Sequence, residues 1–266
     1  MGMSRAQREI IFGGGRFSPQ SVKSATLRSW LRAPDPSMIF QDSAGTVVAT
    51  AVDHPVGRWR DKVVGAPYFS TADDGTRPLW KAGGVLFDGS DDRLVSSNAN
   101  YWAFMHQAAG FAAFFRMAFT AADSGTIHAV IANMESNSVE DGIWISIRDD
   151  GSNSGTMYSF VSKSGASTGL SASENNAHGT EALTFAVLFK AGVSGDDLRY
   201  RWNSVERTGS DTAFTPGSSN PSLTMTIGMR PTTADRFLAA TLKEMLIYEG
   251  VPNADDVTKI ETYLTA

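Results

Sequence analysis

The fold is indicated most directly by residues 142–148, which read Gly-Ile-Trp-Ile-Ser-Ile-Arg. The isoleucines alternate with Trp144, Ser146 and Arg148, and this two-residue period is that of a β-strand. We therefore expect the isoleucines to face a core and the other three side chains to face the opposite way. One strand with two unlike faces favours an antiparallel sheet, whose second face can be less apolar than the first.

Short apolar or alternating segments recur on both sides of this strand. The segment 183–190 is apolar on both faces, which indicates a central strand that is covered on both sides. Loops rich in Gly, Ser, Asn and Asp separate the segments, and alternating strand–helix units are absent. The pattern predicts an all-β fold with roughly ten strands, an antiparallel β-sandwich or jelly roll. The clearest strands are expected at 111–119, 126–133, 142–148, 157–161, 183–190, 198–203, 223–229 and 238–248.

A short helix is predicted at the C-terminal end. Asn253 is a favourable cap residue, and the two acids at 255–256 suit the positive end of the helix dipole. Val257, Ile260 and Leu264 then fall on one face at helical spacing.

The N-terminal residues differ from the strand-rich remainder. Three glycines at 13–15 cannot hold a regular element without a large entropic cost. Residues 1–19 are therefore expected to form either a frayed terminus or an extended arm that orders against a neighbouring subunit. The predicted organisation is an arm at 1–19 and a single lectin-like domain at 20–266.

Composition excludes several classes of protein. The chain has 266 residues, a net charge of −5 and no cysteine, so disulfides and thiolate metal sites are ruled out. A mildly acidic chain lacks the basic footprint of a nucleic-acid-binding protein. No stretch approaches the ~20 apolar residues of a membrane span, and the N-terminus has no apolar run like a signal peptide. We expect neither nucleic-acid binding nor membrane insertion.

Several motifs resemble those of known families. Residues 111–119, 200–203, 226–228 and 242–264 resemble strands and the closing helix of concanavalin A-like/laminin-G-like jelly-roll domains. A more specific series lies in the N-terminal third, at 16–19, 40–46, 54–62, 77–79 and 87–92.

This ordered series is similar to tailed-phage and prophage virion proteins, often described as tail or fibre components. The resemblance implies a location on the phage particle. The family usually continues from Asp61-Lys62 into Ser-Gly and an Asn-His pair, whereas this chain continues with Val63-Val64-Gly65. A ligand contact by that loop is therefore not carried over to this chain.

The sequence offers no catalytic constellation. A retaining glycan hydrolase needs two carboxylates about 5–5.5 Å apart. Glucanase relatives of the fold place them on one strand at Glu-x-Asp-x-(x)-Glu spacing, and this chain has no such string. Its nearest acidic cluster, at 135–141, has the Ser/Asn context of a loop. The four histidines are scattered, and no Gly-x-Ser-x-Gly occurs. We expect no catalytic residues and no enzymatic activity.

Aspartates cluster at 73–74, 88, 91–92, 149–150 and 196–197. Paired loop aspartates can supply some of the six to eight oxygens that Ca²⁺ requires. Asp is also a common turn residue, and none of the pairs has the ligand spacing of a known calcium loop. We expect turns and no cofactor, with Ca²⁺ as the open alternative.

A sugar-binding face is predicted around Trp144, which should point away from the isoleucine layer. Arg148 shares its face, Asp149 follows at the strand end, and Tyr158 joins them if the two strands form a hairpin. The alternative is that this face is covered and Trp144 simply packs, since large aromatic side chains are usually buried.

Together these observations predict a non-enzymatic structural protein of a phage virion. It would display a lectin-like sandwich on the tail, fibre or capsid, and could aid attachment to the host surface. The alternatives are a carbohydrate-binding receptor module and, third, a glycan hydrolase. Expected partners are other virion proteins through the arm, further copies in a homo-oligomer, and host cell-surface glycans.

Overall fold

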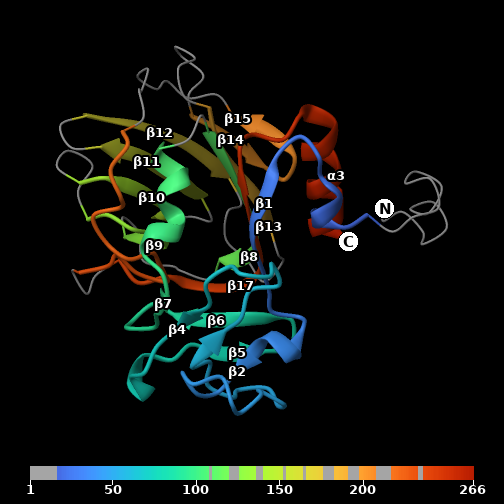
Figure 1. Cartoon of the computed structure of the whole chain (residues 1–266), viewed down its shortest axis with the longest axis vertical. Coiled ribbons are helices and arrows are strands. Elements are labelled where there is room, and N and C mark those ends of the chain that lie inside the picture. Colours follow the sequence, from blue (N-terminus) through green and yellow to red (C-terminus); the bar gives the residue numbers. More distant parts are fainter. Residues whose placement is uncertain are drawn as a thin grey trace.

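Two antiparallel sheets packed face to face form the protein, with one helix outside them (Figure 1). The computed structural model describes residues 17–107, 110–119, 126–135, 140–151, 154–163, 166–175, 183–190, 198–207, 217–232 and 236–266. This architecture confirms the predicted all-β sandwich with its short C-terminal helix. Of the predicted arm, residues 1–16 lie outside the described residues.

Sheet A has eight strands. Its order is β15 (Val205–Arg207), β14 (Leu198–Trp202), β13 (Leu183–Lys190), β8 (Gly110–Phe119), β17 (Ala239–Glu249), β6 (Gly84–Asp88) and β5 (Leu79–Lys81), and β1 (Thr26–Arg32) also pairs with β17. The doubly apolar segment 183–190 lies between β14 and β8, which confirms that it is an interior strand.

Sheet B has nine strands. Its order is β12 (Ala166–Asn175), β11 (Ser154–Lys163), β10 (Gly142–Gly151), β9 (Ile127–Ala132), β16 (Thr226–Ile227), β7 (Leu94–Ser96), β4 (Phe69–Ser70), β3 (Arg58–Trp59) and β2 (Ile39–Phe40). Strands β2, β4 and β7 lie in the lower part of Figure 1 together with β5 and β6 of sheet A. The N-terminal third therefore contributes strands to both sheets.

Helices are short and lie outside the sheets. The C-terminal helix α3 (Ala254–Thr265) begins at Asn253, whose side chain accepts a hydrogen bond from the Asp256 N–H, as its sequence predicts. Helix α2 (Phe104–Gln107) and the 3-10 turns η1 (Pro19–Ser21), η2 (Pro36–Met38), η3 (Asp74–Thr76) and η4 (Asn100–Ala103) are single turns. None of the described helices has the length and apolar character that a membrane crossing requires.

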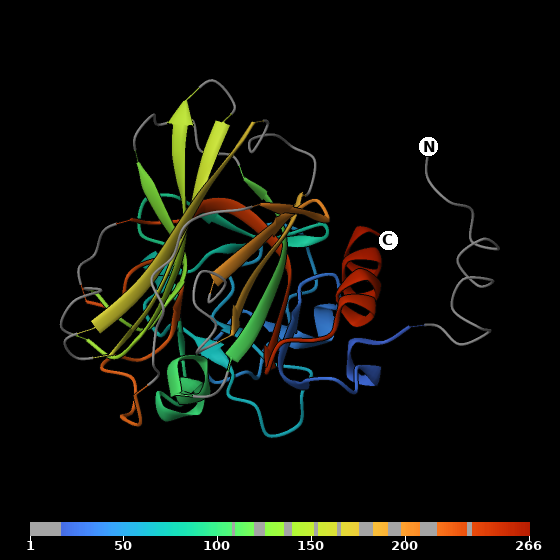
Figure 2. The ribbon, with the colours of Figure 1, turned by 90° about the horizontal axis from the view of Figure 1, so that it is seen from above.

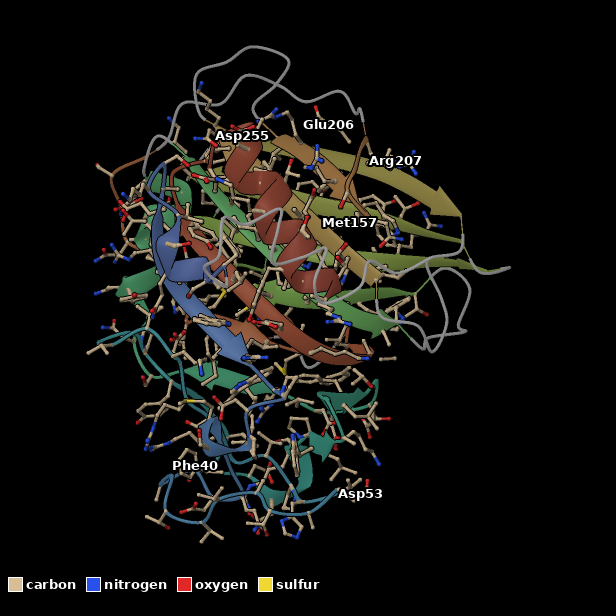
Figure 3. The ribbon with its side chains drawn as sticks, turned by 90° about the vertical axis from the view of Figure 1, so that its right-hand side faces the viewer. Phe40, Asp53, Met157, Glu206, Arg207 and Asp255 are labelled. Atoms are coloured by element: carbon tan, nitrogen blue, oxygen red, sulfur yellow. The ribbon has the colours of Figure 1, made fainter. Side chains whose placement is uncertain are left out.

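The main core fills the space between the two sheets. Ile143, Ile145 and Ile147 point into it from β10, as the alternation predicts. On the sheet A side, the Phe185 ring stacks on Phe115 with 4.5 Å between ring centroids. Side chains fill the molecule from Phe40 and Asp53 at one end to Glu206, Arg207 and Asp255 at the other (Figure 3).

The helix α3 lies against the outer face of sheet A (Figure 2). A second, smaller core lies between them. Val257, Ile260 and Leu264, the predicted apolar face of the helix, pack there against Phe114 and Tyr248. We call this surface the helix face. Phe17 packs against the same cluster, and the Tyr248 hydroxyl donates to the Pro19 carbonyl at 3.0 Å. The end of the predicted arm, residues 17–19, is thus attached to the sandwich.

Two strand predictions differ from the structure. The predicted strand 223–229 is reduced to β16, which ends before Gly228, where φ is 96° and a side chain would collide with the Phe87 ring and the Asp92 carbonyl. Conversely, β12 was not predicted, because its sequence of small polar residues has no apolar alternation. A strand at a sheet edge needs no such alternation when its neighbour supplies the hydrogen bonds.

Candidate functional site

Two neighbouring strands of sheet B carry the predicted sugar-binding residues. Strands β10 and β11 form the expected hairpin, in which Trp144 pairs with Phe160 and Ser146 with Tyr158. On its other side, Trp144 pairs with Ala132 of β9. Because the isoleucines of β10 fill the core, Trp144, Arg148 and Tyr158 share the outer face of sheet B.

Trp144 lies in a small apolar cluster on this outer face. Its side chain is only 8% exposed, and its ring stacks with Phe160 at 5.6 Å between centroids and an interplanar angle of 29°. Trp144 is therefore packed, as the alternative interpretation anticipated, while the Phe160 ring is partly exposed. We call this cluster the tryptophan patch: Ala129, Ala132, Met134, Trp144 and Phe160.

Two arginines lie over the tryptophan patch. The guanidinium carbons of Arg236 and Arg230 are 4.7 and 5.5 Å from the centroid of the Trp144 ring, within the range of a cation–π interaction. Arg230 is also paired with Glu135, with 3.4 Å between Nε and Oε2.

The indole N–H of Trp144 is buried and has no hydrogen-bond acceptor among the described residues. A buried donor without a partner loses the hydrogen bond that water gave it in the unfolded chain, at a cost of about 1–3 kcal/mol. This site therefore retains an unused donor directly beside two positive charges.

Arg148 and Tyr158 extend the same face beyond the patch. The Arg148 Nη1 donates to the Tyr158 hydroxyl at 3.4 Å, and both side chains are half-buried. Asp149 pairs through its backbone with Gly155, but its side chain lies outside the described part of the chain. The structure thus brings Trp144, Arg148 and Tyr158 onto one surface, and sugar binding by these residues stays a prediction.

Two carboxyl groups that the sequence did not predict as notable are buried in the structure, those of Asp61 and Glu244. Asp61 accepts hydrogen bonds from the Ser29 hydroxyl at 2.5 Å, from the Trp30 N–H at 2.9 Å and from the Val63 N–H at 2.8 Å. Burial raises the pKa of its carboxyl to about 6, although the three hydrogen bonds lower it.

Glu244 on β17 is the second buried carboxyl group. Its Oε1 accepts hydrogen bonds from the Trp30 indole N–H at 2.6 Å and from the Tyr263 hydroxyl at 2.7 Å. Burial raises the pKa of Glu244 as well. Asp61 and Glu244 therefore hold Trp30 from two sides and connect β1, β17 and α3. No sequence signal could have found them, because their partners come from distant segments.

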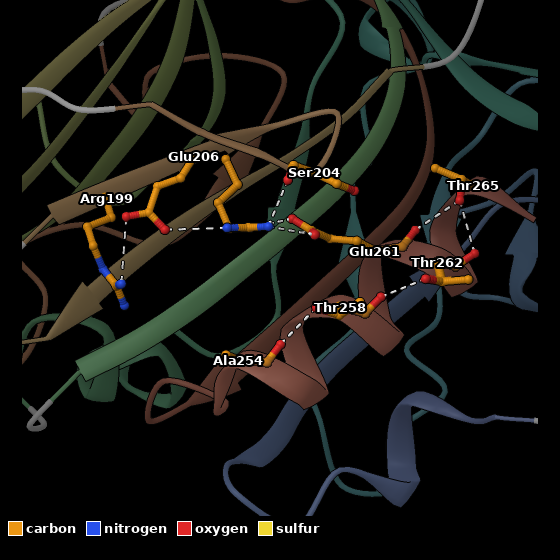
Figure 4. A network of polar contacts seen from close by, with 9 residues as sticks. Arg199, Ser204, Glu206, Ala254, Thr258, Glu261, Thr262 and Thr265 are labelled. Carbon is orange, nitrogen blue, oxygen red and sulfur yellow. Dashed lines mark hydrogen bonds and ion pairs between the residues drawn. The ribbon is translucent and has the colours of Figure 1, made fainter. Parts of the chain in front are cut away.

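An ion-pair network ties α3 to sheet A (Figure 4). Arg201 of β14 donates from Nε and Nη2 to the two carboxylate oxygens of Glu261, at 2.7 and 3.1 Å, and from Nη2 to the Ser204 carbonyl at 2.8 Å. Its Nη1 also contacts Glu206 at 3.3 Å. A bidentate pair of this kind is stronger than a single contact, so this network fixes the helix on the sheet.

The acidic turn after β6 brings three carboxylates together. Ligand oxygens of Asp88, Asp91 and Asp92 lie within 4.8 Å of one another. Asp92 accepts from the Asp88 N–H and Asp88 accepts from the Ser90 N–H, both at 2.8 Å, which is turn chemistry. Burial and the two neighbouring carboxylates raise the pKa of Asp92 to about 6. These residues could supply some ligands of a Ca²⁺ ion, and calcium binding stays a prediction.

No family model matches the chain, and no curated protein does. Solved structures do share its fold. A Trypanosoma rangeli sialidase in complex with 2,3-difluorosialic acid matches 94% of this chain and 35% of its own, with a TM-score of 0.61 and 12% identity. The botulinum neurotoxin serotype D/C binding domain matches 90% of this chain and 52% of its own, with a TM-score of 0.51 and 14% identity.

A further match concerns botulinum neurotoxin type C, whose cell entry is described as dependent upon interaction with two ganglioside molecules. It covers 90% of this chain and 51% of its own, with a TM-score of 0.52 and 11% identity. The chain therefore spans about a third to a half of the proteins it matches. At these identities the likeness establishes the fold alone.

One prediction is contradicted by these comparisons. The chain was expected to have no enzymatic activity, but the fold neighbours include sialidases that match up to 94% of it. The expectation rested on the lack of a carboxylate string along one strand. That reasoning is too narrow, because a fold can bring carboxyl groups from separate segments together, as it does with Asp61 and Glu244 around Trp30.

Proposed function

We propose that this protein binds glycans through the outer face of sheet B, around the tryptophan patch. The observation that carries the proposal is a layer of aromatic rings, partly open to solvent, beside guanidinium and hydroxyl groups on two adjacent strands. Ligand sites commonly combine an apolar floor with a few well-placed polar groups. The comparisons support the proposal, since the same fold occurs in sialidases and in ganglioside-dependent toxins.

The residues contribute to binding in two ways, as an apolar surface and as hydrogen-bonding groups. The partly exposed ring of Phe160 offers an apolar surface to the C–H face of a sugar, and the buried Trp144 ring supports it from beside. Arg148 and Tyr158, half-buried and hydrogen-bonded to each other, offer donors and an acceptor for hydroxyl groups. Rigid strands hold all four, which lowers the entropic cost of binding.

A glycan array with the full chain tests the proposal. We expect binding to a defined set of glycans, weakened about tenfold or more in Tyr158→Ala and in Phe160→Ala. The matched control is Tyr68→Ala, since Tyr68 is also half-buried but lies under Arg58 beyond β3, outside the patch. The proposal fails if no glycan is bound, or if Tyr158→Ala, Phe160→Ala and Tyr68→Ala all bind like the unmodified protein.

Glycoside hydrolysis is a second candidate, favoured by the raised pKa values of Asp61 and Glu244. A carboxyl group whose pKa is raised by burial can act as a general acid. The assay measures the release of a fluorophore from glycoside substrates. Release by the unmodified protein that is lost in both Asp61→Asn and Glu244→Gln would assign this activity. A complete lack of turnover on α- and β-glycosides and on sialosides would exclude these substrates.

We also propose a location on a phage particle, supported by the ordered motifs between residues 16 and 92. Mass spectrometry of purified particles, with immunogold labelling, tests this location. Deletion of residues 1–15 should reduce incorporation if the arm is the attachment segment. Unchanged incorporation would show that attachment uses another surface.

A further inference from the structure

We propose that the apolar residues of the N-terminal arm, Ile10, Ile11 and Phe12, bind to a pocket beside the helix face of their own chain. This interaction surface lies outside the tryptophan patch, and it does not depend on glycan binding. The arm residues lie outside the part of the chain that the structure describes, whereas the pocket and its rim lie within it.

The pocket lies at the edge of the helix face and has a volume of about 360 Å³. Val22, Ala25, Leu27 and Val63 line it, and all four pack in the apolar cluster of the helix face. Val22 is buried, whereas the other three side chains are half-buried. The pocket is therefore a part of this apolar cluster that α3 leaves open to solvent.

Val64 extends the apolar surface beyond the pocket. The Ala66 N–H donates to the Val63 carbonyl at 3.1 Å and Gly65 has φ 84°, so residues 63–66 form a tight turn. Val64 lies at its tip and is 100% exposed, more than any other large apolar residue in the described part of the chain. An apolar segment that covers both the pocket and this turn removes apolar surface from water, which is favourable.

The rim of the pocket is fixed to α3. Ser24, which lies between two lining residues, donates from its hydroxyl to Asp256 at 2.6 Å and accepts from the Asn253 N–H at 3.1 Å. Phe17 packs against Tyr263, with 6.0 Å between the ring centroids. The rim is thus held in place, and Phe17 is a defined point from which the arm starts.

The arm is long enough to reach the pocket. Gln20 lines the pocket and is three residues from Phe17, so their α-carbons are at most ~11 Å apart. Phe12 is five residues from Phe17 in the other direction and can lie up to ~17 Å from it. Three glycines at 13–15 separate them, and glycine permits the reversal of the chain that docking requires.

The short connection also selects the occupant. A segment joined to its binding site by a short flexible linker has an effective concentration in the millimolar range. A second copy of the chain reaches that concentration only in a concentrated solution. The arm of the same chain is therefore favoured over the arm of a neighbour.

The composition of the arm matches that of the pocket. Residues 10–12 are the only run of large apolar residues in the arm, and burial of one such side chain contributes about 1.5–3 kcal/mol. This gain opposes the entropic cost of ordering the arm. Glu9 precedes the run, and Lys23, which lines the pocket, has no ion pair among the described residues. The charges beside the two apolar surfaces are therefore complementary.

Disulfide trapping in the full chain tests the inference, because the chain has no cysteine of its own. Ile11→Cys is combined with Val64→Cys, and disulfide formation under mild oxidation is followed by non-reducing electrophoresis and intact mass. The matched control combines Ile11→Cys with Thr265→Cys, since Thr265 is exposed on α3 near Tyr263, within reach of the arm but outside the pocket. Each rate is normalised to the reaction of the same thiols with a small reagent. We expect the Val64 pair to form an intramolecular disulfide about tenfold faster than the control pair.

A substitution within the arm separates docking from random collision. Phe12→Ser, added to Ile11→Cys/Val64→Cys, removes the ring that docking buries and should slow disulfide formation about tenfold or more. The control is Gln7→Ser, which changes a polar residue of the arm outside the apolar run. This control should leave the rate unchanged.

Three results would overturn the inference. Disulfide-linked dimers in place of the intramolecular product would assign the pocket to the arm of a second copy. Equal rates for the Val64 and Thr265 pairs, or an unchanged rate with Phe12→Ser, would show that the arm does not dock there. All the substituted positions lie outside the tryptophan patch, so these results are independent of whether the glycan array finds a ligand.

Discussion

Trp30 and Trp144 lie on the two outer faces of the same sandwich, and each is 8% exposed. Their surroundings nevertheless differ. The indole N–H of Trp30 donates to Glu244, and its ring packs edge-to-face against Tyr263 of α3. The indole N–H of Trp144 has no acceptor among the described residues, and two arginines cover its ring.

The two buried tryptophans are covered by different kinds of groups. On the helix face the chain provides its own cover: an apolar helix stripe, an ion pair from β14, and a carboxylate for the indole. On the tryptophan patch Phe160 and two arginines cover the ring, and the indole donor has no acceptor among the described residues. A cation also lies over Trp30, because the Lys62 Nζ is 5.2 Å from its ring centroid. The helix face is therefore closed by the chain's own apolar contacts and hydrogen bonds, which indicates a role in stability.

The largest expected loss of stability follows from a substitution within the helix face. Phe114 is fully buried and packs edge-to-face against Tyr248 under α3. Phe114→Ala should lower the free energy of unfolding by about 3–5 kcal/mol, because it leaves a cavity that the helix cannot fill. Urea denaturation measures this loss. Phe160→Ala on the tryptophan patch should cost less than half as much, and equal losses would contradict the comparison.

The second prediction concerns pH. Burial raises the pKa of Asp61 from 3.8 in the unfolded chain to about 6 in the folded one. Between these values the folded state binds a proton that the unfolded state has lost, so Asp61 lowers stability as the pH rises from about 4 to about 6. By the usual 1.36 kcal/mol per pKa unit, this contribution is about 3 kcal/mol at most.

Asp61→Asn should remove this contribution. Denaturation midpoints at several pH values should show a smaller loss of stability between about pH 4 and about pH 6 in Asp61→Asn than in the unmodified protein. Asp92, whose pKa is also raised to about 6, is unchanged in this variant and keeps its own share. Identical pH profiles for the two proteins would show that Asp61 does not titrate in this range.

A paired substitution tests the two tryptophans directly. Trp30→Phe and Trp144→Phe each remove part of a buried ring, but only the first removes a hydrogen bond to a carboxylate. We expect Trp30→Phe to cost about 2 kcal/mol more than Trp144→Phe. Thermal and chemical denaturation of both variants gives the difference. If Trp144→Phe were the costlier change, the Trp144 donor would have a partner after all.

The smallest expected losses of stability come from substitutions that compare a buried ion pair with an exposed one. The Glu261 side chain is 5% exposed and that of Glu206 is 45% exposed, yet both contact Arg201. Glu261→Gln should lower stability by about 1 kcal/mol or slightly more, and Glu206→Gln by a few tenths at most. A double-mutant cycle with Arg201→Ala isolates the Arg201–Glu261 pair.

Much of the fold could be predicted because it follows from local patterns. The alternation in β10 correctly placed its isoleucines inside and Trp144 outside. The doubly apolar β13 is an interior strand, and the Asn253 cap begins the helix. In each case a single segment contains the whole signal, namely its period or its cap.

The remaining features depend on residues that only the fold brings together. Arg230 and Arg236 reach Trp144 from segments about ninety residues further along the chain, and nothing in their local sequence predicts it. Glu244 meets Trp30 across 214 positions. The sequence thus predicted that Trp144, Arg148 and Tyr158 share one face, whereas the arginines over Trp144 and the buried carboxyl groups around Trp30 were not predicted.

Strand β17 has a consequence for how the chain reaches its native state. Its first residues, 239–242, pair with β6, its later residues with β1, and its other edge with β8. During synthesis on a ribosome, β1, β6 and β8 emerge long before the strand that joins them. Long-range pairing of this kind is slow and leaves strand edges open to aggregation. A chain truncated before β17 should therefore accumulate as insoluble material, because β1, β6 and β8 can be joined only after translation has passed residue 249.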